Sequence, residues 1–317
     1  MSTQTIPIVD LQKYISGTES EKQSFVEELG KAFEQVGFVS VKNHGVPEFL
    51  IDEYYTLVQK FFELPTDVKK GYEIPELAGQ RGYTSFGKET AKGYDAPDLK
   101  EFWQLGQTVE GEDVVREIYP PNVVVQEVPV FTQRGVDLYK AFENSGRYLL
   151  RAIANHLDLP ENYFDAHILN GNSILRAIHY PPIKQEPKSA IRAEQHEDIN
   201  LITLLVGASA EGLQLLNKQD EWLDITAPEG CIVVNVGDML QRLTNNRLKS
   251  TTHRVVNPPK EKWHTPRYSI PFFLHPRSEM RLDCLNSCVS SSAPLAYEPI
   301  SAGEYLDERL REIGLKK

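Results

Sequence analysis

Short β-branched segments dominate the chain from about residue 170 onward, and they constrain the fold more than any other feature of the sequence. Turns that contain Gly, Pro or Asn separate them, such as Pro228-Glu229-Gly230 and Asn245-Asn246. Many short strands at this spacing are typical of an all-β sandwich or barrel. The predicted strands cover residues 174–180, 201–206, 213–216, 231–236, 251–256 and 268–274.

Helical periodicity marks the first half of the chain instead. Apolar residues recur on one stripe in segments 20–36, 50–61 and 128–158. A polar stretch rich in Gly and Pro, from about 70 to 125, predicts long loops with short strands, and the tail from Ser301 is again helical. We therefore predict a helical N-terminal half that supports a C-terminal β-barrel around one continuous core.

The composition narrows the classes of partner. The net charge of −11, with no basic run, disfavours nucleic acids and anionic membranes. Three cysteines without metal-ligand or redox spacing fit a reduced cytoplasmic protein. The chain start lacks a basic and apolar leader, and no run approaches the ~18 apolar residues of a membrane span. We expect a cytoplasmic protein with a small-molecule partner; a monomer is compatible with the sequence.

Two histidines and an aspartate carry the most chemical information. In an extended segment His196 and Asp198 point to the same side while Glu197 faces away, and His253 lies on a different predicted strand. Two imidazoles and one carboxylate hold non-haem Fe(II) on one face and leave the opposite positions open. Catalytic zinc sites use similar ligands, but the sequence has no His-Glu-x-x-His helix.

Arg267 and Ser269 supply a guanidinium and a hydroxyl on one face of an apolar segment. Such a pair is suited to binding a carboxylate through charge-assisted hydrogen bonds. A metal with open positions and a nearby carboxylate clamp together indicate an oxygenase that consumes an oxo-acid cosubstrate.

The order of the motifs resembles the isopenicillin N synthase-like branch of the Fe(II)/2-oxoglutarate-dependent oxygenases. The resemblance covers about residues 5 to 310 and includes the metal-ligand candidates. Its other motifs are Ile-Pro-Ile-Val-Asp at 6–10, Asn-His-Gly-Val at 43–46, Tyr-Pro-Pro at 180–182, Gly-Leu-Gln-Leu at 212–215 and Asn-Val-Gly-Asp at 235–238.

This resemblance implies a mainly β fold with flanking helices, in which a double-stranded β-helix (jelly roll) core follows a helical N-terminal region. It divides one continuous globular unit into four regions. These are an N-terminal region at 5–125, a long supporting helix within 126–168, the oxygenase core at 170–280, and a C-terminal tail and helix at 281–317.

The resemblance also implies roles for single residues. The two histidines and the aspartate match the iron ligands of the family. Arg267 and Ser269 match the pair that binds the distal carboxylate of 2-oxoglutarate, and Tyr180 matches a tyrosine that hydrogen-bonds this cosubstrate. Ile178 and His179 depart from the Asn and Tyr that relatives often have there. No catalytic residue beyond the metal centre is implied.

The implied activity is the oxidation of a small organic substrate with O2 and 2-oxoglutarate, by hydroxylation, desaturation or cyclisation, with release of succinate and CO2. Arg81 and Tyr83 lie in a segment that resembles an active-site loop and are candidate substrate contacts. A structural turn with a positive φ at Gly82 is the alternative. Two other functions stay open: an Fe(II) oxidase like isopenicillin N synthase that needs no 2-oxoglutarate, and a non-catalytic binding or sensor protein.

Overall fold

The computed structural model describes residues 6–77, 79–91, 93–94, 96–109, 113–116, 118–207 and 211–312. The ends of two predicted regions, residue 5 and residues 313–317, lie outside this range. The strands are β1 (Ile8–Asp10), β2 (Phe38–Lys42), β3 (Gly82–Thr84), β4 (Glu101–Gly106), β5 (Ile174–Tyr180), β6 (Ala193–His196), β7 (Ile202–Val206), β8 (Leu213–Leu216), β9 (Trp222–Asp224), β10 (Cys231–Val236), β11 (His253–Val255) and β12 (Arg267–Leu274). The α-helices are α1 (Leu11–Ser16), α2 (Glu19–Gln35), α3 (Glu48–Phe62), α4 (Thr66–Lys70), α5 (Phe131–His156), α6 (Asp165–Ile168), α7 (Asp238–Leu243) and α8 (Ala302–Glu312).

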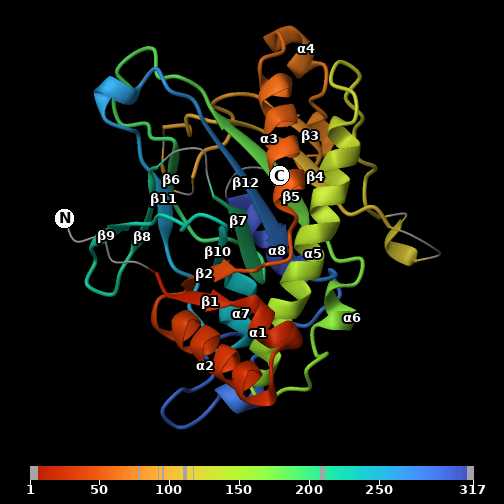
Figure 1. Cartoon of the computed structure of the whole chain (residues 1–317), viewed down its shortest axis with the longest axis vertical. Helices are drawn as coiled ribbons and strands as arrows, with labels where there is room; N and C mark the ends of the chain where they lie inside the picture. The colour runs from red at the N-terminus through yellow and green to blue at the C-terminus, as the bar shows by residue number, and fades with distance from the viewer. Residues whose placement is uncertain are drawn as a thin grey trace.

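Two β-sheets form the centre of the molecule (Figure 1). The larger sheet has eight strands in the order β1-β2-β10-β7-β12-β5-β4-β3, and the smaller has four in the order β6-β11-β8-β9. Buried side chains from both sheets, among them Phe38, Ile178, Leu213 and Val255, belong to one apolar cluster, so the sheets pack against each other. This arrangement confirms the predicted jelly-roll core with a helical N-terminal region.

Helix α2 begins and ends where its sequence directs. The hydroxyl of Thr18 accepts a hydrogen bond from the backbone N–H of Glu21, whose carboxylate accepts one from the N–H of Thr18, which forms a capping box. At the other end Gly37 adopts a φ of +77°, and its N–H donates to the carbonyl of Ala32. Gly37 therefore ends α2 with a left-handed glycine.

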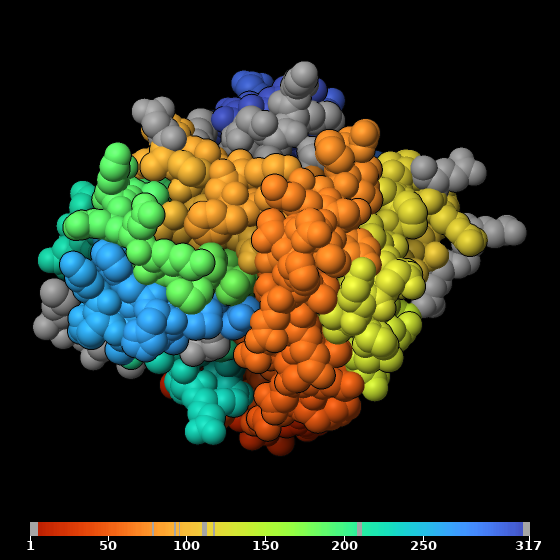
Figure 2. Space-filling view, turned by 90° about the horizontal axis from the view of Figure 1, so that it is seen from above, coloured from red at the N-terminus to blue at the C-terminus, as the bar shows by residue number. Residues whose placement is uncertain are grey.

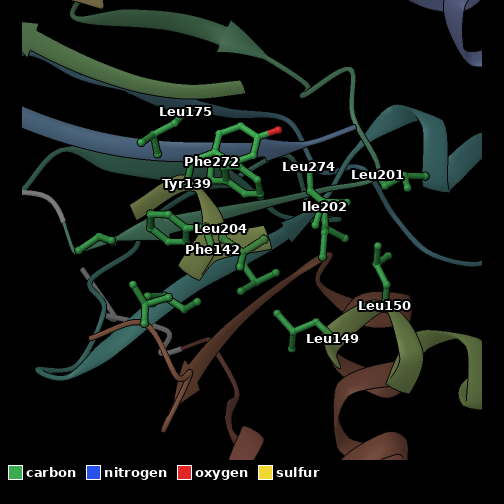
Figure 3. Packing of buried hydrophobic residues seen from close by; sticks show 14 of the residues in the cluster. Tyr139, Phe142, Leu149, Leu150, Leu175, Leu201, Ile202, Leu204, Phe272 and Leu274 are labelled. Carbon is green, nitrogen blue, oxygen red and sulfur yellow. The ribbon is translucent and has the colours of Figure 1, made fainter. Parts of the chain in front are cut away.

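Helix α5 covers one face of the larger sheet, as Figure 3 shows. The ring of Phe142 stacks on Phe272 of β12 at 5.6 Å between centroids, and Tyr139 meets the same ring edge-on at 4.9 Å. A Cβ atom at Gly146 would lie 2.3 Å from Cδ1 of Leu274, so glycine permits the close approach of helix and sheet. Each fully buried apolar side chain of this kind contributes about 1.5–3 kcal/mol to stability.

The structure also contains strands that the periodicity of the sequence did not predict. Strands β1, β3 and β9 have three residues each, too few to show a pattern of alternation, and β4 and β6 contain no β-branched residue. Strand β11 is shorter than the predicted 251–256, and its register with β6 shifts between His253 and Val255. None of the described helices combines the length and the apolar character that crossing a membrane requires.

Candidate metal centre

The smaller sheet brings the three predicted metal ligands together. His196 ends β6 and stands directly opposite His253 of β11, and the two imidazole rings lie 4.5 Å apart. The Nε2 atoms of His196 and His253 lie 4.0 and 3.8 Å from carboxylate oxygens of Asp198. One ligand atom from each residue lies within 4.8 Å of the other two. This spacing and this donor set fit one divalent ion, and no other group of this kind occurs among the described residues.

Hydrogen bonds to the backbone orient both imidazoles for this role. Nδ1 of His196 lies 2.7 Å from the carbonyl oxygen of Glu194, and Nδ1 of His253 lies 3.0 Å from that of Thr251. Because a carbonyl oxygen only accepts, each Nδ1 carries the proton and each Nε2 keeps its lone pair for a metal. Burial, with the neighbouring His253, lowers the pKa of His196 to about 4, so its ring is neutral near pH 7.

Two side chains fix the carboxylate of Asp198. The hydroxyl of Thr203 and the amide of Asn235 donate to its Oδ2 at 2.6 and 2.8 Å, and Asn200 in turn donates to the hydroxyl of Thr203 at 2.8 Å. Burial raises the pKa of Asp198, but the two histidines and these hydrogen bonds outweigh it, so the pKa lies below its ordinary value. The carboxylate is therefore ionised, and Oδ1 remains available to an ion.

A small cavity of about 80 Å³ extends from the metal ligands to the predicted carboxylate clamp. Arg267, Ser269 and Tyr180 all line it, and Ile178 contributes an apolar wall. The register of β12 and β5 places Arg267 opposite Tyr180, with the guanidinium 4.9 Å from the centre of the phenol ring. Arg267 is only 1% exposed, so it supplies a buried positive charge.

The departure at 178–179 has a structural consequence. Because side chains alternate along β5, Ile178 faces the small cavity while His179 faces away from it. Nδ1 of His179 lies 2.7 Å from the carboxylate of Glu101, and its ring stacks on Tyr268. His179 therefore belongs to a buried polar network behind the sheet.

A second, larger cavity of about 710 Å³ opens on His196 and Asp198, which line both cavities. Its lining comes from β4, β5, β12 and the segment before β4, together with α8 near the end of the chain. Figure 2 shows the blue C-terminal segment beside the orange segment that precedes β4. A small molecule in this cavity lies beside His196 and Asp198, which it shares with the small cavity.

The two candidate substrate contacts separate in the structure. Tyr83 lines the larger cavity, and its hydroxyl donates to Glu101. Arg81 lines neither cavity; it is fully buried against Gly106 and donates to the carbonyl of Gln80 at 2.8 Å. The intervening Gly82 has a φ of +76°, as the turn alternative required.

Comparisons with known proteins place this geometry in context. Residues 6–127 match the family described as non-haem dioxygenase in morphine synthesis N-terminal, and residues 171–276 match the 2OG-Fe(II) oxygenase superfamily. The proline hydroxylase buaE of Petromyces alliaceus is 31% identical, over 95% of this chain and 97% of that protein.

Two solved structures are similar over nearly their whole length. A putative 2OG-Fe(II) oxygenase family protein of Caulobacter crescentus is 43% identical, with a TM-score of 0.88 over 97% of this chain and 99% of that one. A full-length protein of Neurospora crassa, solved in complex with alpha-KG and thymine, is 31% identical, with a TM-score of 0.84 over 96% of each chain.

Proposed function

Because this chain belongs to the 2OG-Fe(II) oxygenase superfamily, we propose a role for each side chain that meets at its metal centre. The protein is a non-haem Fe(II)- and 2-oxoglutarate-dependent dioxygenase that oxidises small substrates. One observation carries the assignment of roles: two cavities of different size share the metal ligands His196 and Asp198.

In our proposal His196, Asp198 and His253 hold the Fe(II) ion. The ion supplies the redox chemistry with O2 when it is bound, and the protein supplies position and exclusion of water. The backbone carbonyls that accept from the imidazoles and the donors on Asp198 keep the three ligand atoms aimed at one point.

Arg267 and Ser269 bind the distal carboxylate of 2-oxoglutarate, and Tyr180 lies beside it. The proposal rests on the position of Arg267 and Ser269 in the small cavity, two residues apart on the same face of β12. A guanidinium presents a planar fork that pairs with a carboxylate through two parallel hydrogen bonds. The apolar wall beside it, to which Ile178 belongs, reduces competition from water.

The substrate to be oxidised occupies the larger cavity. The relative from Neurospora crassa binds thymine together with alpha-KG, which supports a small molecule as the partner of the larger cavity here. Separate spaces for cosubstrate and substrate also argue against a 2-oxoglutarate-independent oxidase, in which the arginine clamp would have to hold the substrate itself.

The proposal is tested by metal binding and cosubstrate turnover together. We expect wild-type protein with Fe(II) to form succinate only when 2-oxoglutarate is present, and His253→Ala to lose both Fe(II) binding and succinate formation. His264→Ala is the control, since His264 is exposed and lines neither cavity. Full Fe(II) affinity in His253→Ala, or O2 uptake indifferent to 2-oxoglutarate, contradicts the proposal.

A further inference from the structure

Arg176 is the polar side chain best placed to recognise a substrate, because it lines both cavities. Its Nε donates to Oε1 of Gln104 at 2.6 Å, and its Nη1 lies 3.3 and 3.4 Å from the carboxylate oxygens of Glu89. Its guanidinium carbon lies 4.2 Å from the ring centre of Phe102 and 5.3 Å from that of Phe273. Four neighbours therefore hold this guanidinium in one orientation.

The remaining nitrogen of this rigid group, Nη2, has no partner among the described residues. It is not one of the polar atoms that are buried without a hydrogen-bond partner, so Nη2 is exposed. An accessible donor is thus fixed beside the metal ligands, where it can bind an acceptor atom of a substrate without reorganisation.

The charges around Arg176 indicate which kind of acceptor fits. Glu89 neutralises Arg176 and also pairs with Lys100 at 2.6 Å, while Lys100 pairs with Asp98 at 2.8 Å. The two positive charges of Arg176 and Lys100 therefore already balance the two negative charges of Glu89 and Asp98. An incoming carboxylate would stand uncompensated beside Glu89, and like charges in contact across an interface cost several kcal/mol.

The rest of the larger cavity has a similar bias: outside these four residues, and apart from the metal ligand Asp198, its described lining holds four carboxylates and two cationic side chains. These carboxylates are Glu73, Glu197, Asp238 and Glu312, and the cations are Lys88 and Arg309. A substrate that carries a negative charge is therefore disfavoured, and one that carries N–H donors finds abundant acceptors.

A neutral histidine adds an acceptor to the lining of this cavity. Nδ1 of His275 lies 3.2 Å from the carbonyl oxygen of Phe273, so Nδ1 carries the proton and Nε2 accepts. Burial lowers the pKa of His275 to about 4, which keeps the ring neutral near pH 7. Asn172, which also lines this cavity, adds an amide that both donates and accepts.

From these contacts we propose that the substrate is a small neutral compound with an amide or imide group, whose carbonyl accepts a hydrogen bond from Nη2 of Arg176. This inference rests on the proposed function, since it places the compound in the larger cavity beside the metal. An amide supplies an acceptor for the guanidinium and an N–H donor for the acceptors around it, and it adds no charge.

The test measures binding without turnover. Full-length protein is loaded with Ni(II) and N-oxalylglycine, an unreactive analogue of 2-oxoglutarate, and is titrated by calorimetry with two matched pairs of probes. Uracil and 2-pyrrolidinone are neutral; orotate and pyroglutamate are the same rings with one carboxylate added. We expect each neutral probe to bind at least about tenfold more tightly than its carboxylated partner.

Two variants separate recognition from general stability. Arg176→Lys keeps the positive charge beside Glu89 but lacks the planar fork, so neutral probes are expected to bind at least about tenfold more weakly. Affinity for N-oxalylglycine is expected to change by less than about twofold, because the clamp at Arg267 is intact. Arg254→Lys is the matched control: Arg254 stacks on Trp222 at 3.8 Å and donates to a glutamine, yet it lines neither cavity.

The possible results distinguish a failure of the inference about the substrate from a failure of the proposed function. Loaded protein that binds neither neutral probe, or prefers the carboxylated ones, overturns the inference and leaves the proposed function intact. Unchanged binding of neutral probes by Arg176→Lys also overturns it. Wild-type protein that fails to bind N-oxalylglycine with Ni(II) overturns the proposed function, and the inference falls with it.

Discussion

Replacing Thr203 by valine is expected to weaken metal binding although Thr203 does not touch the ion. Its hydroxyl is one of two donors on Oδ2 of Asp198, at 2.6 Å, and valine has nearly the same shape without the hydroxyl. A hydrogen bond to an ionised group contributes about 1.5–3 kcal/mol. Loss of an outer partner of a metal ligand typically weakens affinity by roughly 10–100-fold. We expect a loss in this range for Mn(II), a redox-stable substitute for Fe(II).

The assay is a titration of metal-free protein with Mn(II), followed by electron paramagnetic resonance of the free ion. Thr203→Ser is the control because it keeps the hydroxyl and is expected to retain most of the affinity. The valine variant also leaves the amide of Asn200 without its acceptor, which costs about 1–3 kcal/mol of folding free energy. Thermal unfolding without metal measures that cost separately. Mn(II) affinity within about twofold of wild type in Thr203→Val would refute the outer-partner reasoning.

Three further predictions concern the clamp, the charge network and the core. Arg267→Lys is expected to raise the KM for 2-oxoglutarate at least about tenfold while substrate affinity holds, and an unchanged KM would argue against the clamp. Burial raises the pKa of Glu89, but Lys100 and Arg176 lower it to about 2, so the stability from these ion pairs is present above the ordinary value of 4.5 and is lost as pH falls towards 2. In chemical denaturation Glu89→Gln should therefore show a smaller loss of unfolding free energy over that pH window than wild type; an equal loss counts against the network. Gly146→Val should lower the unfolding free energy by about 1–3 kcal/mol through collision with Leu274, and unchanged stability would mean that α5 shifts freely.

The metal centre was the most predictable part of the molecule. His196 and Asp198 are two residues apart on an extended segment, so the sequence alone placed both side chains on one side. The partners of Asp198 were not predictable in the same way. Asn235 belongs to a motif of the sequence and Thr203 to a predicted strand, but their contact with Asp198 depends on how the strands pack.

The arginines show where sequence reasoning reached its limit. Arg81 was a candidate because its segment resembles an active-site loop, yet it is buried against Gly106, outside both cavities. Arg176 lies in a correctly predicted strand, but the face that it presents to the cavity depends on pairing with β4. Strand β4 lies in the stretch 70–125, whose weak periodicity predicted mainly loops. A pairing that joins such distant segments is set by tertiary structure, which no local pattern encodes.

The larger sheet takes strands from nearly the whole length of the chain. Strands β1 and β2 come from its beginning, and β2 borders β10, while β4, which pairs with β3, borders β5 on the opposite side. A fragment limited to 171–276 would expose the edges of both β10 and β5, which invites aggregation. We therefore expect the two segments that match separate families to unfold in one cooperative transition, because neither folds without the other.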